Sequence, residues 1–328
     1  MADVLKYSKK VIVSDIGASN IRFGLYLENA DGQDATVEYI EKYDRSTFGA
    51  FHDALTTYQR SLARKIDISA LPISIAAAGS RINAHSWRFS QEQWAFKKDP
   101  RIISTISDLE GFALGALSNK THVEIRAGAS EKDPQMNDTV IAVGTGLGLS
   151  YVDRTGITQK THGGHMCAFG ITLEQNTILR IVQRLADRDY MVVYEDLASG
   201  LGLVKLYQAV CLYNGFPVLF FTPEDILEKA DANVLEQTLR LFHEFLGLFA
   251  HMALVFGHGY HGLYLGGGVI DVLNKRGLFD QETFIKFLNQ DAQPIVAKNL
   301  ENCPIYLISD SNIALYGAGQ ATHHLECA

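Results

Sequence analysis

The chain has 328 residues, of which 47% are hydrophobic and 10% aromatic, enough for about two folded domains, and this composition argues against disorder. A formal net charge of −8 without long lysine or arginine runs argues against a nucleic-acid-binding surface. The four cysteines are scattered and the N-terminus is polar, so the sequence predicts a cytoplasmic protein without a signal peptide.

The first predicted element is a β-hairpin over residues 11–26. Its apolar first strand ends near Asp15, and its turn consists of the small residues Gly17, Ala18, Ser19 and Asn20. Small residues allow backbone N–H groups to approach a phosphate closely, and a carboxylate beside them can hold a hydrated metal cation. Asp and Gly are also common in plain hairpin turns, so this motif alone leaves both interpretations open.

A junction between a strand and a helix follows. The pattern predicts a helix over residues 47–63 capped by Ser46 or Thr47, and strands over 72–78 and 102–106. The last of these strands leads into Ser107 and Asp108, after which the spacing of apolar residues is helical. Open α/β sheets place functional groups at the carboxyl ends of strands. An Asp at this point can also cap the following helix, and the two roles are compatible.

A second glycine-rich hairpin lies at residues 139–152, with the turn Gly144-Thr145-Gly146-Leu-Gly148. Two phosphate-sized hairpins suggest a duplicated architecture that binds one ligand from both sides. This pattern resembles the actin/hexokinase/Hsp70-like ATPases. Other phosphate sites fit less well, because the chain has no P-loop motif and no protein-kinase signature. The glycine spacing also differs from that of a dinucleotide site, which needs a helix where a strand is predicted here.

The rest of the chain continues the alternation of strands and helices. The predicted elements are a helix over 172–185 with a Thr172/Gln175 capping box, a helix opened by Ser199, a glycine turn at Gly266–Gly268, a strand over 305–308 and a helix over 313–320. The segment 239–256 is apolar but interrupted by Arg240, His243, Glu244 and His251. Its length and charges favour a long buried helix over a membrane span.

The motifs, taken in chain order, resemble one family, the bacterial ATP-dependent glucokinases that are distinct from the ROK family. They are Asp15-Ile-Gly-Ala-Ser-Asn, His85-Ser-Trp87-Arg-Phe-Ser, Ser107-Asp108, Gly144-Thr-Gly-Leu-Gly, Gly163-Gly-His165, Ser199-Gly-Leu-Gly-Leu-Val-Lys-Leu-Tyr and Gly266-Gly-Gly. Each motif is weak alone, but seven in family order over most of the chain form a strong signal.

The resemblance implies an α/β, two-domain actin-like ATPase (ribonuclease H-like) fold with an interdomain cleft. It implies a small domain over residues 1–109, completed by 311–328, and a large domain over 110–310. The expected reaction is phosphoryl transfer from ATP, with Mg²⁺, to the 6-hydroxyl of glucose. The expected partners are a small-molecule sugar and a second copy of the chain in a homodimer, without nucleic acid or membrane.

The resemblance also assigns roles to residues. Asp108 matches the catalytic base, and Asp15 would hold Mg²⁺ through water. The residues that would border the nucleotide are Asp15, Gly17, Ala18, Ser19, Asn20, Thr145, Gly146, Gly266, Gly267 and Gly268. Those that fall on sugar contacts are Ser107, His162, His165 and Glu195. A triple glycine can also be a plain strand-to-helix turn.

The predicted sugar site departs from the family at two positions. Members usually have Glu-Gly-Gly-His where this chain has His162-Gly163-Gly164-His165, and Asn-Asp where it has Ser107-Asp108. A neutral imidazole has one acceptor and one donor, whereas a carboxylate accepts through two oxygens, and His can become charged near neutral pH. These differences predict a weakened or altered sugar preference.

Three alternatives follow from the same residues. In the first alternative, the chain is a kinase for another sugar, such as a mannose- or amino-sugar-type substrate. In the second, it is a non-catalytic sugar or nucleotide sensor with the same fold. The intact Asp15, Asp108 and glycine hairpins disfavour the sensor. Separately, the spacing His162-x-x-His165-x-Cys167 is compatible with zinc, but a fourth ligand is not evident.

Overall fold

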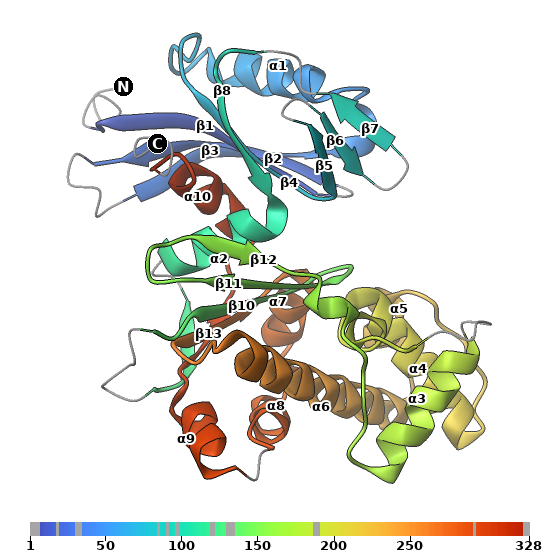
Figure 1. Cartoon of the computed structure of the whole chain (residues 1–328). Helices are drawn as coiled ribbons and strands as arrows, with labels where there is room; N and C mark the ends of the chain where they lie inside the picture. Colours follow the sequence, from blue (N-terminus) through green and yellow to red (C-terminus); the bar gives the residue numbers. More distant parts are fainter. Residues whose placement is uncertain are drawn as a thin grey trace. The chain divides into compact units, whose positions relative to one another are not determined.

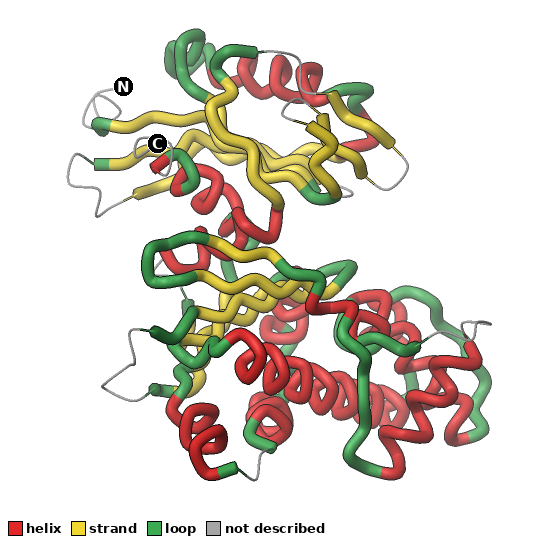
Figure 2. The backbone as a smooth tube through the Cα atoms, in the orientation of Figure 1, coloured by secondary structure: helices red, strands yellow, loops and turns green. Residues whose placement is uncertain are grey.

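The computed structural model describes residues 7–17, 20–29, 35–83, 86–89, 92–95, 99–118, 122–128, 135–185, 191–290 and 293–323. The chain forms two compact units. Unit 1 comprises Met1–Lys120 and Asn312–Ala328, and unit 2 comprises Thr121–Ser311. Figures 1 and 2 show the elements of each unit by label and by type. The sequence-based domain boundaries at 109 and 310 stay a prediction.

Unit 1 is built on a five-stranded sheet with the order β3-β2-β1-β4-β8. Strand β2 is antiparallel to both of its neighbours, β1 and β3, whereas β4 and β8 continue the sheet in parallel with β1. The elements of this unit are β1 (Lys9–Ile16), β2 (Asn20–Glu28), β3 (Ala35–Asp44), η2 (Arg45–Thr47), α1 (Phe51–Leu62), β4 (Ile73–Ala77), β5 (Ser80–Asn83), β6 (Ser86–Phe89), β7 (Glu92–Ala95), β8 (Ile102–Ser107), α2 (Asp108–Ser118) and α10 (Ile313–Gln320). The hairpin predicted over residues 11–26 is therefore confirmed as β1–β2.

Helix α1 begins later than the sequence predicted. The prediction placed its start at residue 47 with Ser46 or Thr47 as cap, but α1 begins at Phe51. The Asp44 carboxylate accepts hydrogen bonds from both the N–H and the hydroxyl of Ser46, so these residues form the short turn η2 instead. Phe48 then returns to an extended conformation. A local side-chain bond of this kind competes with helix initiation.

Helices α2 and α10 cross at glycines in unit 1. A Cβ on Gly317 would lie 1.7 Å from the carbonyl oxygen of Gly111, and one on Gly115 would lie 2.0 Å from that of Ile313. No larger residue fits these positions because the two backbones are in direct contact. The crossing fixes α2, whose first residue is Asp108. The last helix of the chain thus supports the helix that carries the predicted base.

Unit 2 repeats the strand arrangement of unit 1. Its sheet has the order β12-β11-β10-β13-β14-β9, in which β12, β11 and β10 are antiparallel and β10, β13 and β14 are parallel. Strand β9 is added at the edge in antiparallel orientation. The bounds are β9 (Val123–Arg126), β10 (Asp138–Val143), β11 (Leu147–Val152), β12 (Thr158–Lys160), β13 (Gly262–Gly266) and β14 (Ile305–Ile308). The predicted duplication is present in the strand order itself.

Of the helices of unit 2, α4, α8 and α9 pack against the long helix α6, and α3 and α5 pack against α4. Their bounds are η3 (Gly163–His165), α3 (Leu173–Leu185), η4 (Tyr194–Asp196), α4 (Gly200–Asn214), α5 (Pro223–Lys229), α6 (Ala232–Gly257), α7 (Gly268–Lys275), α8 (Gln281–Leu288) and α9 (Pro294–Asn302). The capping box predicted for α3 is confirmed, because Gln175 N–H donates to the Thr172 hydroxyl and Thr172 N–H donates to the Gln175 side-chain oxygen, each at 3.1 Å.

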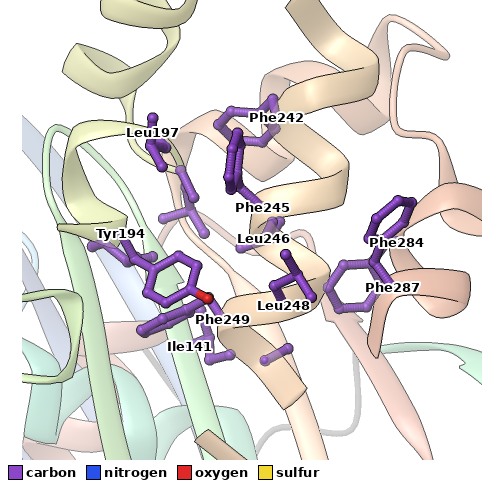
Figure 3. Close-up of a cluster of buried hydrophobic side chains, with 14 of the residues drawn as sticks. Ile141, Tyr194, Leu197, Phe242, Phe245, Leu246, Leu248, Phe249, Phe284 and Phe287 are labelled. Carbon is purple, nitrogen blue, oxygen red and sulfur yellow. The ribbon is translucent and has the colours of Figure 1, made fainter. Parts of the chain in front are cut away.

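Helix α6 forms the centre of the unit 2 core (Figure 3). Phe249 lies against Tyr194 of η4 with ring centroids 5.4 Å apart, and Phe284 and Phe287 of α8 are buried in the same cluster. Among the described residues, α6 is the one helix long and apolar enough to cross a membrane, but 78% of its most apolar window is buried inside the fold. It is therefore a core helix, as the sequence predicted.

Candidate active site

Asp15 lies near the end of β1 and is paired with Arg22 on β2. The two residues are directly opposite in the hairpin register, and Nη1 of Arg22 lies 2.9 Å from Oδ2 of Asp15. Burial raises the pKa of the Asp15 carboxyl above its ordinary value, while the charge and hydrogen bond of Arg22 oppose that shift. Arg22 thus compensates in part for the cost of keeping a carboxylate charged inside the protein.

The predicted magnesium role fits this arrangement. Mg²⁺ in phosphate-transfer sites keeps several waters and is bound by one or two carboxylates together with substrate phosphates. Asp15 supplies one such carboxylate, and the hydrogen bond from Arg22 is donated to its Oδ2 atom. The donor chemistry therefore suits a metal held through water.

The turn after Asp15 is tight. Gly17 N–H donates to the carbonyl of Asn20 at 2.8 Å, which closes the hairpin between β1 and β2. Gly17 and Asn20 are at the two ends of this turn, where the sequence predicted phosphate contacts. Ala18 and Ser19 of the same prediction, and His85 of the family motif, lie outside the described residues.

Ser107 and Glu110 form a reciprocal cap at the start of α2. The Ser107 hydroxyl donates to Oε2 of Glu110 at 2.6 Å and accepts from Glu110 N–H at 3.2 Å, while Ser107 N–H donates to Oε2 at 2.8 Å. This is a capping box, so Ser107 and not Asp108 occupies the cap position. The half-buried Asp108 is the first residue of the helix, and its Oδ1 accepts from Leu109 N–H at 2.9 Å.

The cap restricts what Ser107 can offer a sugar. Its single hydroxyl proton is donated to Glu110, and one of its two lone pairs is used by Glu110 N–H. One acceptor site remains, and no donor. An Asn side chain, which the family usually has here, offers both. The predicted sugar contact of Ser107 stays a prediction, limited to accepting a hydrogen bond.

In unit 2, three segments meet at the glycine turn between β10 and β11. Gly200, the first residue of α4, donates its N–H to the carbonyl of Gly144 at 2.8 Å. A Cβ on Gly200 would lie 3.7 Å from Cα of Thr145 and 3.5 Å from a methyl group of Val269. The turn, the start of α4 and the start of α7 are therefore neighbours, and Thr145 is exposed among them.

The glycine turn before α7 requires a glycine at position 267. Gly267 has φ +102°, and a Cβ there would lie 2.5 Å from the carbonyl oxygen of Val143. Gly266 ends β13 and pairs with Ala142 of β10, whereas a Cβ on Gly268 would meet nothing within 4 Å. Gly267 is thus required by the fold, while Gly268 leaves open space where the nucleotide was predicted.

The predicted sugar-binding residues of unit 2 are close together. Nε2 of His165 lies 4.0 Å from Oε1 of Glu195, and the rings of His162 and His165 are 6.4 Å apart. Both His residues are exposed; His162 directly precedes the short turn η3, and His165 is its last residue. The structure thus places His162, His165 and Glu195 on one surface of unit 2.

Two glycines allow this turn to lie directly on β11. A Cβ on Gly163 would lie 2.4 Å from a Leu149 methyl group, and one on Gly164 would lie 2.2 Å from the carbonyl oxygen of Leu147. The glycine pair therefore brings the flanking His side chains close to the glycine turn. Over the described ranges, no group of three His, Cys, Asp or Glu residues is arranged to hold a metal ion, so the zinc alternative gains no support.

Two residues were not identified from the sequence. Glu110 carries a visible signal, because Ser107-x-x-Glu110 is the pattern of a capping box. Arg22 carries a weaker one: its pairing with Asp15 depends on a hairpin register that a glycine-containing turn leaves open.

The fold and these sites define an actin-like sugar kinase with ATP as its phosphoryl donor. The chain matches the family described as Glucokinase over residues 12–325. It belongs to this family and is an ATP-dependent hexose kinase, and the predicted family and enzyme class are confirmed. Curated relatives include the glucokinase of Saccharophagus degradans, 29% identical over 94% of this chain and 96% of that protein. The glucokinase of Photorhabdus laumondii is 26% identical over 94% and 95% of the two chains.

Solved structures confirm the fold prediction. A glucokinase from an Antarctic psychrotroph superposes with a TM-score of 0.79 at 24% identity, covering 97% of this chain and 99% of that one. A ROK family glucokinase from Streptomyces griseus, solved with glucose and AMPPNP, superposes with a TM-score of 0.59 at 17% identity, over 95% and 98% of the chains. The chain therefore has the two-domain, actin-like α/β fold.

Proposed function

We propose that the protein transfers the γ-phosphoryl group of ATP to the 6-hydroxyl of glucose, with Asp108 as the general base. The supporting observation is that residues other than Asp108 cap the start of α2. Ser107 and Glu110 cap the helix, so the Asp108 carboxylate is not needed as the cap. A carboxylate in the first turn of a helix is stabilised by the helix dipole, and a positioned carboxylate can accept a proton as a general base.

The nucleotide would be bound by backbone groups rather than by basic side chains. In unit 1 these belong to the turn between Gly17 and Asn20, and in unit 2 to Thr145 and Gly146. The exposed Gly268 and the adjacent Gly266 and Gly267 would border the adenosine. Bound Mg²⁺ would neutralise phosphate charge, and Asp15 would hold it through water. Arg22 would offset in part the cost of charging the buried Asp15 in that role.

The test is a coupled ADP-release assay with MgATP across glucose, mannose and amino sugars. Turnover of glucose supports the proposal. Turnover restricted to another sugar contradicts the assigned substrate and supports the alternative kinase. Sugar binding without turnover of any sugar contradicts catalysis and supports a sensor.

His162 favours the alternative substrate, because it replaces a carboxylate that accepts two hydrogen bonds. Replacing His162 with Glu is expected to lower the KM for glucose about tenfold, since an unpaired buried hydroxyl costs about 1–3 kcal/mol and 1.4 kcal/mol is tenfold. The value of kcat should change little.

Steady-state rates with glucose and mannose measure this effect. A His162→Gln variant serves as the control, because it supplies an amide without the negative charge. An unchanged or higher KM for glucose in His162→Glu would contradict the assignment of His162 to the sugar.

Three further properties are proposed from the family resemblance. These are a cytoplasmic location, assembly as a homodimer, and a place in glycolysis. The two-domain division at residues 109 and 310 is proposed on the same basis.

A further inference from the structure

Glu195 is bonded to the glycine turn of unit 2 as well as facing His165. Its Oε2 accepts a hydrogen bond from Leu147 N–H at 2.8 Å, at the end of the turn. The start of the turn is held by Gly200 N–H, which donates to the carbonyl of Gly144. The Ser199 hydroxyl in turn donates to the backbone carbonyl of Glu195 at 2.7 Å. One short segment, residues 195–200, therefore holds the turn at both ends.

Gly146 is the position that makes room for this carboxylate. A Cβ on Gly146 would lie 2.6 Å from Oε2 of Glu195, closer than any van der Waals contact. The φ of Gly146 is not in the left-handed region, so alanine is compatible with its backbone. Only the end of the Glu195 side chain would have to move. The missing side chain at position 146 thus serves the contact with Glu195.

The middle of the turn is available to a ligand. Within the described part of the chain, the backbone N–H groups of Thr145 and Gly146 donate no hydrogen bond to another residue. These are the groups that the proposed function assigns to phosphate. The other oxygen of Glu195, Oε1, faces His165 at 4.0 Å. One side chain therefore contacts the turn and also lies beside the residues assigned to sugar.

We infer that Glu195 is a positioning residue for the nucleotide, in addition to the sugar contact predicted for it; this inference rests on the proposed function. Leu147 is buried, so without Glu195 its N–H would lose its partner at a free-energy cost. The turn would lose one of its two anchors, and its phosphate-binding N–H groups would be less preorganised. Preorganised donors bind more tightly because less order has to be created on binding.

The test compares Glu195→Ala with Glu195→Gln in the full chain, using AMPPNP with Mg²⁺ and no sugar. Both variants remove the negative charge of Glu195, so any gain in affinity from reduced repulsion of the phosphates is the same in both. Only Gln keeps an oxygen that can accept from Leu147 N–H. The dissociation constant of AMPPNP is expected to be about tenfold higher for Ala than for Gln, equivalent to about 1.4 kcal/mol. Equal constants would overturn the inference.

A second variant tests the contact without altering Glu195. Gly146→Ala pushes the carboxylate away from Leu147, so it should weaken AMPPNP binding in the otherwise unchanged protein. In the Glu195→Ala background the same substitution should have no effect, because the clashing atom is gone. Equal losses in both backgrounds would contradict the inference. Thermal unfolding of each variant establishes that it is folded. If one variant fails to fold, the other pair of variants still tests the contact.

Steady-state kinetics separate this inference from the proposed function. Glu195→Gln should keep the KM for ATP and raise the KM for glucose, whereas Glu195→Ala should raise both. If the unchanged protein neither binds AMPPNP nor phosphorylates glucose, the proposed function fails. If it does both and the Ala and Gln variants share one KM for ATP, only the positioning role fails.

Discussion

Replacement of Asp108 with Asn is expected to lower kcat on glucose by about 10²–10⁴-fold, the usual contribution of a general base. Asn keeps the shape of the side chain and an oxygen that can accept from Leu109 N–H, but it cannot take the hydroxyl proton. Because Ser107 and Glu110 cap the helix, the start of α2 should persist. The KM for glucose and the affinity for AMPPNP should change far less than kcat.

Asp53→Asn is a matched control for this experiment. Asp53 is also an acidic residue in the first turn of a helix of unit 1, namely α1, and it is exposed. The same chemical change there should leave kcat unaltered. Initial rates and thermal unfolding of both variants are the measurements. A fully active Asp108→Asn enzyme would refute the assigned base, and a parallel loss in both variants would point to folding instead.

His243, which is buried in α6, is expected to make the free energy of unfolding depend strongly on pH. Its Nδ1 lies 2.6 Å from the carbonyl of Leu239, and its Nε2 accepts from Asp280 N–H at 3.2 Å. The ring must therefore be neutral, with its proton on Nδ1. Burial lowers the pKa of His243 from 6.5 to about 4, against the opposing effects of the Leu239 carbonyl and the nearby Asp280 charge.

This depressed pKa makes the protein sensitive to acid. Above pH 6.5, His243 is neutral in both the folded and the unfolded chain, and its contribution to stability is complete. Between pH 6.5 and about 4 the unfolded chain binds a proton that the folded chain does not. Stability therefore falls with decreasing pH, by about 3 kcal/mol in total, since each pKa unit corresponds to about 1.4 kcal/mol.

A His243→Gln variant should lack this part of the pH dependence. Gln has no titrating group, so its free energy of unfolding should fall less between pH 6.5 and 4 than that of the unchanged protein. Urea unfolding followed by far-ultraviolet circular dichroism measures the difference. His258→Asn is the control, because His258 is exposed. Identical pH profiles for His243→Gln and the unchanged protein would contradict the assignment.

Local patterns in the sequence predicted the two hairpins, the core helix and the α3 cap, because spacing and residue type alone determine them. The start of α1 was wrong because a single Asp44 side chain redirects the backbone at Ser46. The Asp15–Arg22 pair required the strand register. The bond between Glu195 and Leu147 joins residues 48 apart, and no local pattern encodes such a contact. Local sequence patterns therefore predicted the elements that carry the candidate site, but not the long-range contacts that hold those elements in place.

The glycine crossing of α10 on α2 has a consequence for biosynthesis. Unit 2 is one continuous stretch of chain, whereas unit 1 takes its final helix from Asn312 onward. On the ribosome, domains fold as units as they emerge, so unit 2 has all of its residues before unit 1 does. The helix that begins with Asp108 cannot pack against α10 until α10 has been translated. Activity should therefore appear only after synthesis of the polypeptide is nearly finished.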